Sequence, residues 1–273
     1  MTRTVKILAW GGDGVETKYP IVLAHGIAVR EWRFFKAFGR VEKTLREAGY
    51  VVYTANTDAF GSIENNAAQL KTQIEEILRK EGVDKVNIIA HSKGGLDAKY
   101  MINELGEANS VASLTTLCTP HKGSRMATRI YNLPRWIPRF LAFWINLWSR
   151  ILGDKHPDAL TVCQQLQLSE SDEIETLDAS NEVYCQSYSS TMKRGRDDFL
   201  MSVPHYFARR WGEVETDGLV TVDSAKYAEY RGDCIEESLS HTELIGLSLK
   251  KKKRRKVYAF YLSLCRELSE RGF

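Results

Sequence analysis

The segment AHSKGG at 90–95 has the residue types for nucleophilic catalysis by a serine. An apolar run ends at Ala90 and a helical stripe begins at Ala98, so Ser92 would lie on a tight turn between a strand and a helix. Such a turn exposes the hydroxyl at the carboxyl edge of a sheet and requires small neighbours, here Ala90 and Gly94. We therefore expect Ser92 to be a catalytic nucleophile, and the alternative is a serine that only caps the helix.

A serine nucleophile needs a histidine base and a carboxylate that orients this base. In this strand–turn–helix arrangement the three residues occur in the order Ser, acid, His. Of the six histidines, only His241 follows both a plausible acid loop and the last expected strand. Asp217 lies in the loop TDGLV, where a glycine permits a sharp turn, and Asp223 is the alternative acid. The sequence thus predicts a triad of Ser92, Asp217 and His241.

The run PIVLAHGI at 20–27 ends in a flexible His-Gly turn that would lie beside the serine turn. We expect the backbone N–H groups of Ile27 and Lys93 to form an oxyanion hole, aided by the positive end of the helix that starts there. His25 is expected to support the loop rather than to transfer protons. The Lys93 side chain is expected to face solvent, because a cation gains nothing from the dipole at a helix start.

Alternating strand and helix patterns would position these residues. This alternation predicts an α/β fold, a three-layer sandwich around a mostly parallel central sheet, formed by a single domain over 1–273. Strands are expected at 21–24, 50–55, 86–90, 114–118, 183–188 and 234–237, and helices at 34–45, 67–78, 98–105 and 257–268.

The strand pattern stops at 121–168, which we expect to be an inserted helical region. Its part 130–152 is dense in Trp, Phe, Ile and Leu on most helical faces, with Pro134 and Pro138 as breakers, so we predict one or two helices. A solvent-exposed helix of this kind would leave a large apolar patch. We interpret the region as a lid that covers an acyl pocket and meets a lipid surface when open. A fixed accessory core layer and a site for a protein partner are the alternatives.

The charge balance is almost even, with 38 Lys and Arg against 35 Asp and Glu, so no nucleic-acid partner is expected. The excess is concentrated in Lys250–Lys256, seven consecutive cations. This basic run could be a nuclear-localisation-like string, a patch for anionic membranes or a solvated helix start. Because seven cations would surround a helix, we expect part of the run to be loop or a frayed helix end.

No export, membrane or metal signal is apparent. The longest uncharged apolar stretch, 140–149, is about half of the roughly 20 residues that a spanning helix needs, so no transmembrane segment is expected. Residues 1–10 look like a strand rather than a signal segment, so we expect a cytoplasmic protein, or a secreted one if a leader has been removed. Five cysteines without metal-ligand spacing predict neither a disulfide framework nor a zinc site.

The motifs PIVLAHGI, AHSKGG, TPHKGS, DGLV and the late SH together resemble the bacterial triacylglycerol lipase and esterase family of α/β-hydrolases over about residues 19–245. The elbow resembles that of small Bacillus lipases, and DGLV with the longer insertion resembles the Pseudomonas and Burkholderia type. This resemblance implies Ser92 as nucleophile, Asp217 as acid, His241 as base, and Ile27 with Lys93 as oxyanion residues. It implies cleavage of acyl esters or lipids through an acyl-enzyme.

The same resemblance leaves other activities open: a phospholipase, an acyl thioesterase or, less readily, a non-catalytic binding protein of this fold. The chain also departs from the Pseudomonas type. The calcium site there uses an acidic residue two places after the catalytic histidine and an amide four places further, where this chain has Glu243 and Leu247. We expect no metal and no cofactor.

Overall fold

The computed structural model describes residues 16–27, 36–168 and 183–273. In these residues six parallel strands form one sheet in the order β2-β1-β3-β4-β5-β6. The strands are β1 Ile21–Ala24, β2 Val52–Thr54, β3 Val86–His91, β4 Val111–Leu117, β5 Tyr184–Ser189 and β6 Glu229–Asp233. The helices are α1 Val41–Glu47, α2 Ile63–Glu81, α3 Lys93–Asn103, α4 Arg125–Tyr131, α5 Trp136–Ile151, α6 Ala159–Gln165, α7 Ser202–Arg210, α8 Val222–Ala225 and α9 Lys251–Glu270.

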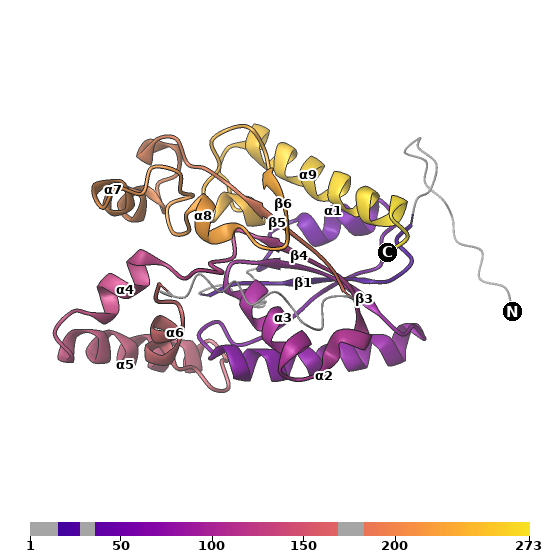
Figure 1. Ribbon diagram of the computed structural model, residues 1–273, viewed down its shortest axis with the longest axis horizontal. Helices are drawn as coiled ribbons and strands as arrows, with labels where there is room; N and C mark the ends of the chain where they lie inside the picture. Colours follow the sequence, from indigo (N-terminus) through magenta and orange to yellow (C-terminus); the bar gives the residue numbers. More distant parts are fainter. Residues whose placement is uncertain (1–15, 28–35, 169–182) are drawn as a thin grey trace, which may run out of the picture.

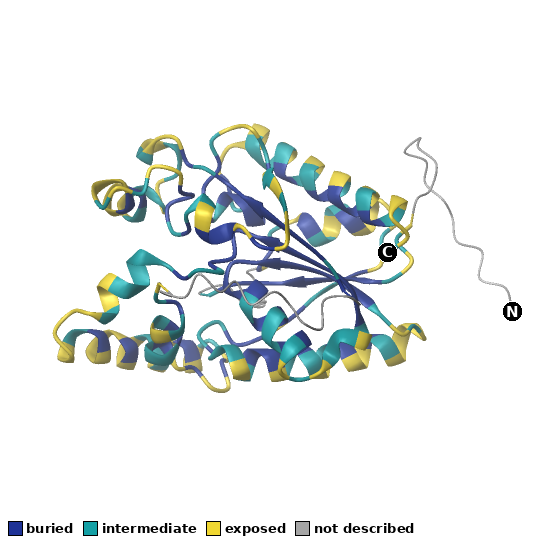
Figure 2. Cartoon of the chain, viewed as in Figure 1, coloured by how far each residue is buried: buried dark blue, intermediate teal, exposed yellow. Residues whose placement is uncertain are grey.

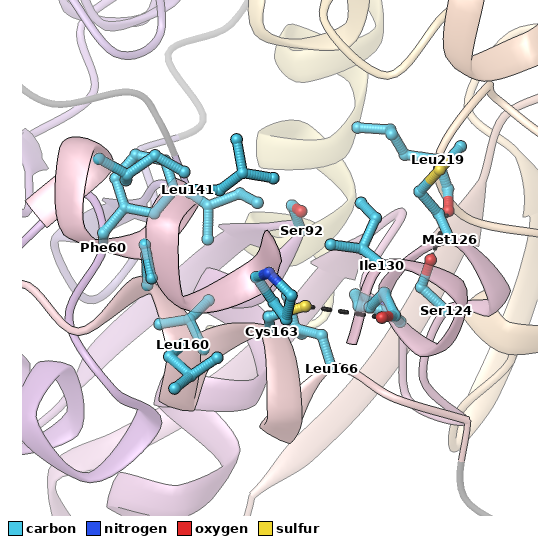
Figure 3. A pocket seen from close by; sticks show the side chains of 18 of the residues that line it. Phe60, Ser92, Ser124, Met126, Ile130, Leu141, Leu160, Cys163, Leu166 and Leu219 are labelled. Atoms are coloured by element: carbon cyan, nitrogen blue, oxygen red, sulfur yellow. Dashed lines mark hydrogen bonds between the residues drawn. The ribbon is translucent and has the colours of Figure 1, made fainter. Parts of the chain in front are cut away.

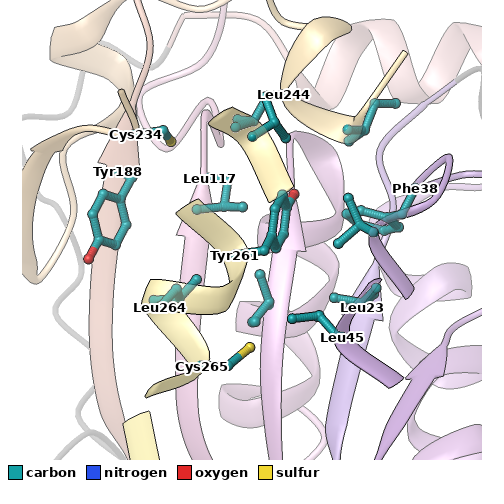
Figure 4. Packing of buried hydrophobic residues seen from close by; sticks show 14 of the residues in the cluster. Leu23, Phe38, Leu45, Leu117, Tyr188, Cys234, Leu244, Tyr261, Leu264 and Cys265 are labelled. Carbon is teal, nitrogen blue, oxygen red and sulfur yellow. The ribbon is translucent and has the colours of Figure 1, made fainter. Parts of the chain in front are cut away.

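Helices cover both faces of the sheet, with α2 and α3 on one side and α1 and α9 on the other (Figure 1). Every residue of the central strands β3 and β4 is buried, as is usual for parallel strands between two helical layers. The strand pleat divides the core in two: Leu23 packs toward α9 and Val22 toward α2 and α3. On the α9 side, Tyr261 meets the ring of Phe38 edge to face, with centroids 6.4 Å apart (Figure 4). The predicted α/β sandwich is thus confirmed.

The last strand lies earlier than predicted. We expected it at 234–237, whereas β6 ends at Asp233. This strand pairs only with β5, and its side chains alternate between exposed and half-buried, so it lacks the apolar run that identifies an inner strand. Helix α7 was not predicted either. The strand expected at 1–10 and part of the helix expected at 34–45 lie outside the described residues.

The inserted region 121–168 is helical, as expected, and contains α4, α5 and α6. Its part 130–152, where one or two helices were expected, holds the end of α4 and the whole of α5. Pro138 does not break α5, because it is the third residue of that helix, where its missing N–H costs no intrahelical bond. The part of the basic run that is loop, as expected, is Lys250 alone. Residues Lys251 to Lys256 form the first turns of α9, which its buried Val257, Tyr261 and Leu264 hold against the sheet.

Candidate active site

Ser92 occupies a strained turn between β3 and α3. Its backbone angles are φ 55° and ψ −133°, a left-handed region that few residues other than glycine adopt. Two neighbours hold this turn: the Ser92 N–H donates to the carbonyl of Leu117 (3.0 Å), and the Thr119 hydroxyl donates to the carbonyl of Ser92 (2.8 Å). Strain maintained by the surrounding fold is characteristic of functional turns, and here it fixes the position of the hydroxyl.

Two glycines allow the loop after β1 to touch this turn. A Cβ on Gly26 would lie 2.6 Å from Cβ of Ser92, and one on Gly94 would lie 2.5 Å from the carbonyl oxygen of His25. Lys93 is the first residue of α3, so its N–H has no acceptor within the helix. Ile27 lines the same cavity as Ser92. The structure therefore brings the two expected oxyanion donors, Ile27 and Lys93, to the neighbourhood of Ser92.

His241 and Asp217 form a direct pair. Nδ1 of His241 lies 2.6 Å from Oδ2 of Asp217, and the Asp217 carboxyl is completely buried. The other carboxyl oxygen accepts the N–H groups of Leu219 (2.9 Å) and Val220 (2.8 Å), which fix its orientation. Because Nδ1 faces this acceptor, Nε2 is the nitrogen left to exchange a proton with a substrate or with Ser92. The alternative acid, Asp223, is exposed and instead pairs with Lys122 (3.0 Å).

The loop that carries His241 is held from both sides by Asp198. Oδ2 of Asp198 accepts the hydroxyl of Ser240 (2.5 Å) and that of Thr242 (2.6 Å), the residues before and after the histidine. Partial burial is the largest single effect on the pKa of Asp198 and raises it, but the hydrogen bonds that the carboxylate accepts together outweigh burial and leave the pKa lowered. Asp198 was not among the predicted site residues, since nothing in the local sequence pattern relates it to a loop more than forty residues away.

Glu243 anchors the same loop. Its carboxylate accepts the Ser240 N–H (3.3 Å) and the Ser248 hydroxyl (2.7 Å), and it forms an ion pair with Lys253. In the described part of the chain, no group of three or more His, Cys, Asp or Glu side chains is placed to hold a metal ion. Glu243, the acidic residue at the position of the calcium pattern, has Lys253 as its cationic partner.

The Lys93 side chain is buried, so the expectation that it faces solvent is wrong. Its ammonium lies 2.5 Å from Oδ1 of Asp97, one helical turn later, and Asn66 donates to Oδ2 of the same carboxylate (3.2 Å). An opposite charge at i+4 compensates for the loss of water around the lysine. Burial raises the pKa of Asp97 to about 6, although Lys93 and Asn66 act in the opposite direction.

Two further histidines surround the site. Nε2 of His91 donates to the carbonyl oxygen of His241 (3.1 Å), and the two rings lie 4.5 Å apart. Burial, followed by the proximity of His241, lowers the pKa of His91 well below its usual value, so this ring stays neutral. His25 donates from Nδ1 to the carbonyl of Gly26 (2.9 Å), and its other nitrogen lies 3.5 Å from the Thr57 hydroxyl. The first contact lies within the loop after β1, and the second joins that loop to the segment after β2.

A cavity of about 310 Å³ opens above Ser92 and His241. Figure 3 shows the Ser92 hydroxyl among apolar side chains from α4, α5 and α6. Helix α5 contributes one face to this lining: Pro138, Leu141, Ala142 and Ile145. Its other face is exposed to solvent (Figure 2) and consists of aromatic and aliphatic residues: Trp136, Phe140, Phe143, Trp144, Leu147, Trp148 and Ile151. The cavity suits an acyl chain, since hydrocarbon needs no hydrogen-bond partner.

The chain is similar to known lipases in sequence and in fold. Triacylglycerol lipase 2 of Saccharomyces cerevisiae is 29% identical over 254 residues, which cover 85% of this chain and 73% of the yeast protein. The triacylglycerol lipase of Burkholderia plantarii is 30% identical over 57% of this chain, and the match spans 46% of that protein, about half its length. The crystal structure of the mature Bacillus licheniformis lipase BlEst2 aligns with a TM-score of 0.65 at 21% identity, covering 95% of this chain and 96% of that one. The Staphylococcus hyicus lipase aligns with a TM-score of 0.66 at 16% identity, covering 96% and 98%.

Residues 20–190, more than half of the chain, match the sequence model of the family described as palmitoyl protein thioesterase. That stretch includes the turn of Ser92, the strands β1 to β5 and the inserted helices. The chain belongs to the palmitoyl protein thioesterase family, and with its lipase relatives it is an α/β-hydrolase of the lipase and esterase type.

Proposed function

We propose that this chain cleaves acyl esters as a serine carboxylester hydrolase, with Ser92 as nucleophile, His241 as base and Asp217 as the orienting acid. The observation that carries the proposal is the buried Asp217–His241 pair (2.6 Å), because His241 shares an apolar cavity with a serine on a strained turn. No single one of these features identifies a hydrolase, but their combination is the arrangement that acyl transfer requires.

In the first step, Nε2 of His241 takes the proton of the Ser92 hydroxyl as Oγ attacks the ester carbonyl. Asp217 stabilises the imidazolium that forms, since its carboxylate accepts a hydrogen bond from Nδ1–H. The neutral state of His91 matters here, because a second cation beside His241 would oppose this protonation.

The tetrahedral oxyanion lies against the backbone N–H groups of Ile27 and Lys93, near the positive end of α3. Collapse of this intermediate breaks the ester C–O bond, and His241 returns its proton to the departing alcohol. Water, activated by His241, then attacks the acyl-enzyme and releases the acid. Removing one oxyanion donor typically costs about 10²–10³ in kcat.

For the substrate, we propose an ester with a hydrocarbon acyl chain, presented at a lipid–water interface. The inner face of α5 lines the cavity, and its exposed outer face carries five aromatic side chains together with Arg135, Arg139 and Arg150 nearby. An apolar face flanked by arginines is the composition of helices that lie in a membrane interface. We assign α4 to α6 as a lid on this basis. In the described residues, no helix is both long and apolar enough to cross a bilayer.

The deciding experiment is hydrolysis of p-nitrophenyl esters from acetate to stearate by the wild type and by Ser92→Ala. A loss of turnover to background with an unchanged circular-dichroism spectrum supports the proposal, and near-wild-type turnover refutes it. Fluorophosphonate labelling gives an independent readout: the wild type and the control Ser110→Ala should become labelled, whereas Ser92→Ala should not. Failure of the wild type to label would favour a non-catalytic binding protein.

An acyl thioesterase is the second candidate, favoured by the family to which residues 20–190 belong. The same triad and cavity would accept a thioester, since the attacked carbonyl and the acyl chain are the same. Oxygen ester and thioester substrates with one common palmitoyl chain separate the two activities. A kcat/KM for the thioester that exceeds the ester by more than their intrinsic reactivity ratio would favour the thioesterase.

A further inference from the structure

A second groove, of about 450 Å³, lies where the start of α1 meets the first turns of α9. Four cations line this groove: Arg40, Lys251, Arg254 and Arg255. The remaining lining residues are Tyr258 and two glycines, so none is acidic. We call it the cationic groove.

The backbone shapes the cationic groove. Gly39 and Gly246 have φ of 50° and 82°, in the left-handed region that suits glycine. A Cβ on Gly39 would lie 3.2 Å from the carbonyl oxygen of Gly246, so the two turns approach each other without an intervening side chain. The ring of Tyr258 lies against Gly246, 3.3 Å from where a Cβ would be. The cations thus stand around a fixed hollow formed by two elements far apart in the sequence.

The charges of the cationic groove are unfavourable in the absence of an anion. The first turn of α9 contains no acidic residue, and cations at a helix N-terminus oppose the helix dipole. Lys251 also lies three and four residues before Arg254 and Arg255, a spacing at which like charges repel. An anion in the groove would reverse both effects.

Other members of the basic run have partners elsewhere. Lys253 pairs with Glu243 and Lys256 with Glu237, and neither lysine lines the groove. One guanidinium nitrogen of Arg254 donates to the carbonyl of Ser248 (2.7 Å), which holds its side chain in place. In the described part of the chain, no carboxylate forms an ion pair with any of the four groove cations.

We propose that the cationic groove binds the phosphate group of a phosphomonoester. A phosphate carries nearly two negative charges at neutral pH, and guanidinium groups bind its oxygens through paired N–H donors. The N-terminus of α9 adds backbone donors and a favourable dipole. The groove, about 450 Å³ in volume, has room for this group and for part of the molecule that carries it. Either a lipid headgroup or a soluble phosphate ester could supply that group.

Two double variants with equal change of net charge test the groove. Lys251→Gln/Arg255→Gln removes two exposed cations that line it, and Lys252→Gln/Lys256→Gln removes two cations of the same run that do not. Inorganic phosphate is titrated calorimetrically into the wild type and both variants at constant ionic strength. Cosedimentation with phosphatidylcholine vesicles containing phosphatidic acid, a phosphomonoester, is compared with vesicles containing phosphatidylglycerol, a phosphodiester.

We expect saturable phosphate binding by the wild type and the control, weakened at least about tenfold in the groove variant, which corresponds to about 1.4 kcal/mol. Groove-dependent sedimentation with phosphatidic acid identifies a lipid headgroup as the source, whereas phosphate binding without it identifies a soluble ester. Equal losses in the two variants would show diffuse charge attraction and overturn the proposal. So would the absence of both saturable phosphate binding and any preference for phosphatidic acid. Both variants should retain p-nitrophenyl ester turnover, so the result is independent of the proposed hydrolase activity.

Discussion

The carboxylate of Glu243, two residues after His241, lies 2.5 Å from the ammonium of Lys253 at the start of α9. The side chains are 3% and 12% exposed, so water screens this pair little. Glu243 also accepts the backbone N–H of Ser240, and its carboxylate therefore links the loop of His241 to the last helix. One lysine of the basic run is in this way part of the support of the candidate active site.

Breaking this pair should destabilise the protein and disturb the His241 loop. In Glu243→Gln the ammonium of Lys253 loses its carboxylate, and the loss of one partner of a buried pair costs about 3–5 kcal/mol. At the same pH, we expect the variant to have a lower urea midpoint and a lower kcat than the wild type. Glu237→Gln, which removes the partner of the more exposed Lys256, should cost less than about 1 kcal/mol. Equal effects of the two substitutions would contradict the supporting role of Glu243.

Asp217→Asn should reduce kcat by about 10⁴, because an amide no longer fixes the His241 tautomer or stabilises the imidazolium. The KM should change little, since Asp217 does not line the cavity. Asp223→Asn is the matched control and should retain nearly full activity, because that carboxylate is exposed and bonded to Lys122. Steady-state kinetics on one soluble ester checks both variants, and the reverse order of losses would assign the acid to Asp223.

The buried His91 should make the protein less stable in acid. Its pKa in the folded chain lies well below 6.5, so below about pH 6.5 the unfolded chain binds a proton that the folded chain does not. Neutral His91 therefore makes its full contribution to the free energy of unfolding above about pH 6.5, and this contribution is lost progressively as the pH falls below that value. His91→Gln keeps an N–H donor for the carbonyl of His241 and should flatten the stability curve below about pH 6.5. Urea unfolding between neutral and mildly acid pH tests this, and parallel curves for both proteins would contradict it.

The outer face of α5 should matter for insoluble substrates only. Phe143 and Trp148 are 61% and 63% exposed and do not line the cavity. Phe143→Ser/Trp148→Ser should lower adsorption to, and turnover of, an emulsified long-chain ester, because less apolar surface enters the interface. Turnover of a dissolved short-chain ester should be unchanged. Leu249→Ser, at an exposed residue of another segment, is the control, and equal losses on both substrates would argue against an interfacial role.

Secondary structure could be predicted from the sequence wherever the residues that form an element are contiguous and carry a clear hydrophobic pattern. The strands β1, β3 and β4 were predicted because residues buried on both faces form short apolar runs, and α2 because its apolar residues recur at helical spacing. The edge strand β6 was misplaced since its half-exposed pleat carries no such run. The turn of Ser92 was predictable because its strand, small residues and helix are contiguous.

Contacts between distant segments could not be derived in this way. We expected the Lys93 side chain to face solvent because a cation gains nothing from the dipole at a helix start. In the structure, Asp97 compensates its charge in the interior, and Asn66 donates to the same carboxylate. The sequence proposed Asp217 from chain order, and the tertiary structure alone brings it to His241 and leaves Asp223 at the surface. The clamp of Asp198 on Ser240 and Thr242 has no local signal at all.

The sequence by itself therefore determined the fold class, the serine turn and the short set of candidates for base and acid, because hydrophobic period and turn chemistry are local properties. The tertiary structure decided which side chains are buried, which charges are paired and which cations of the basic run share a groove with Arg40. Those outcomes depend on desolvation and on distances between residues far apart in the chain, and neither can be read from spacing along it.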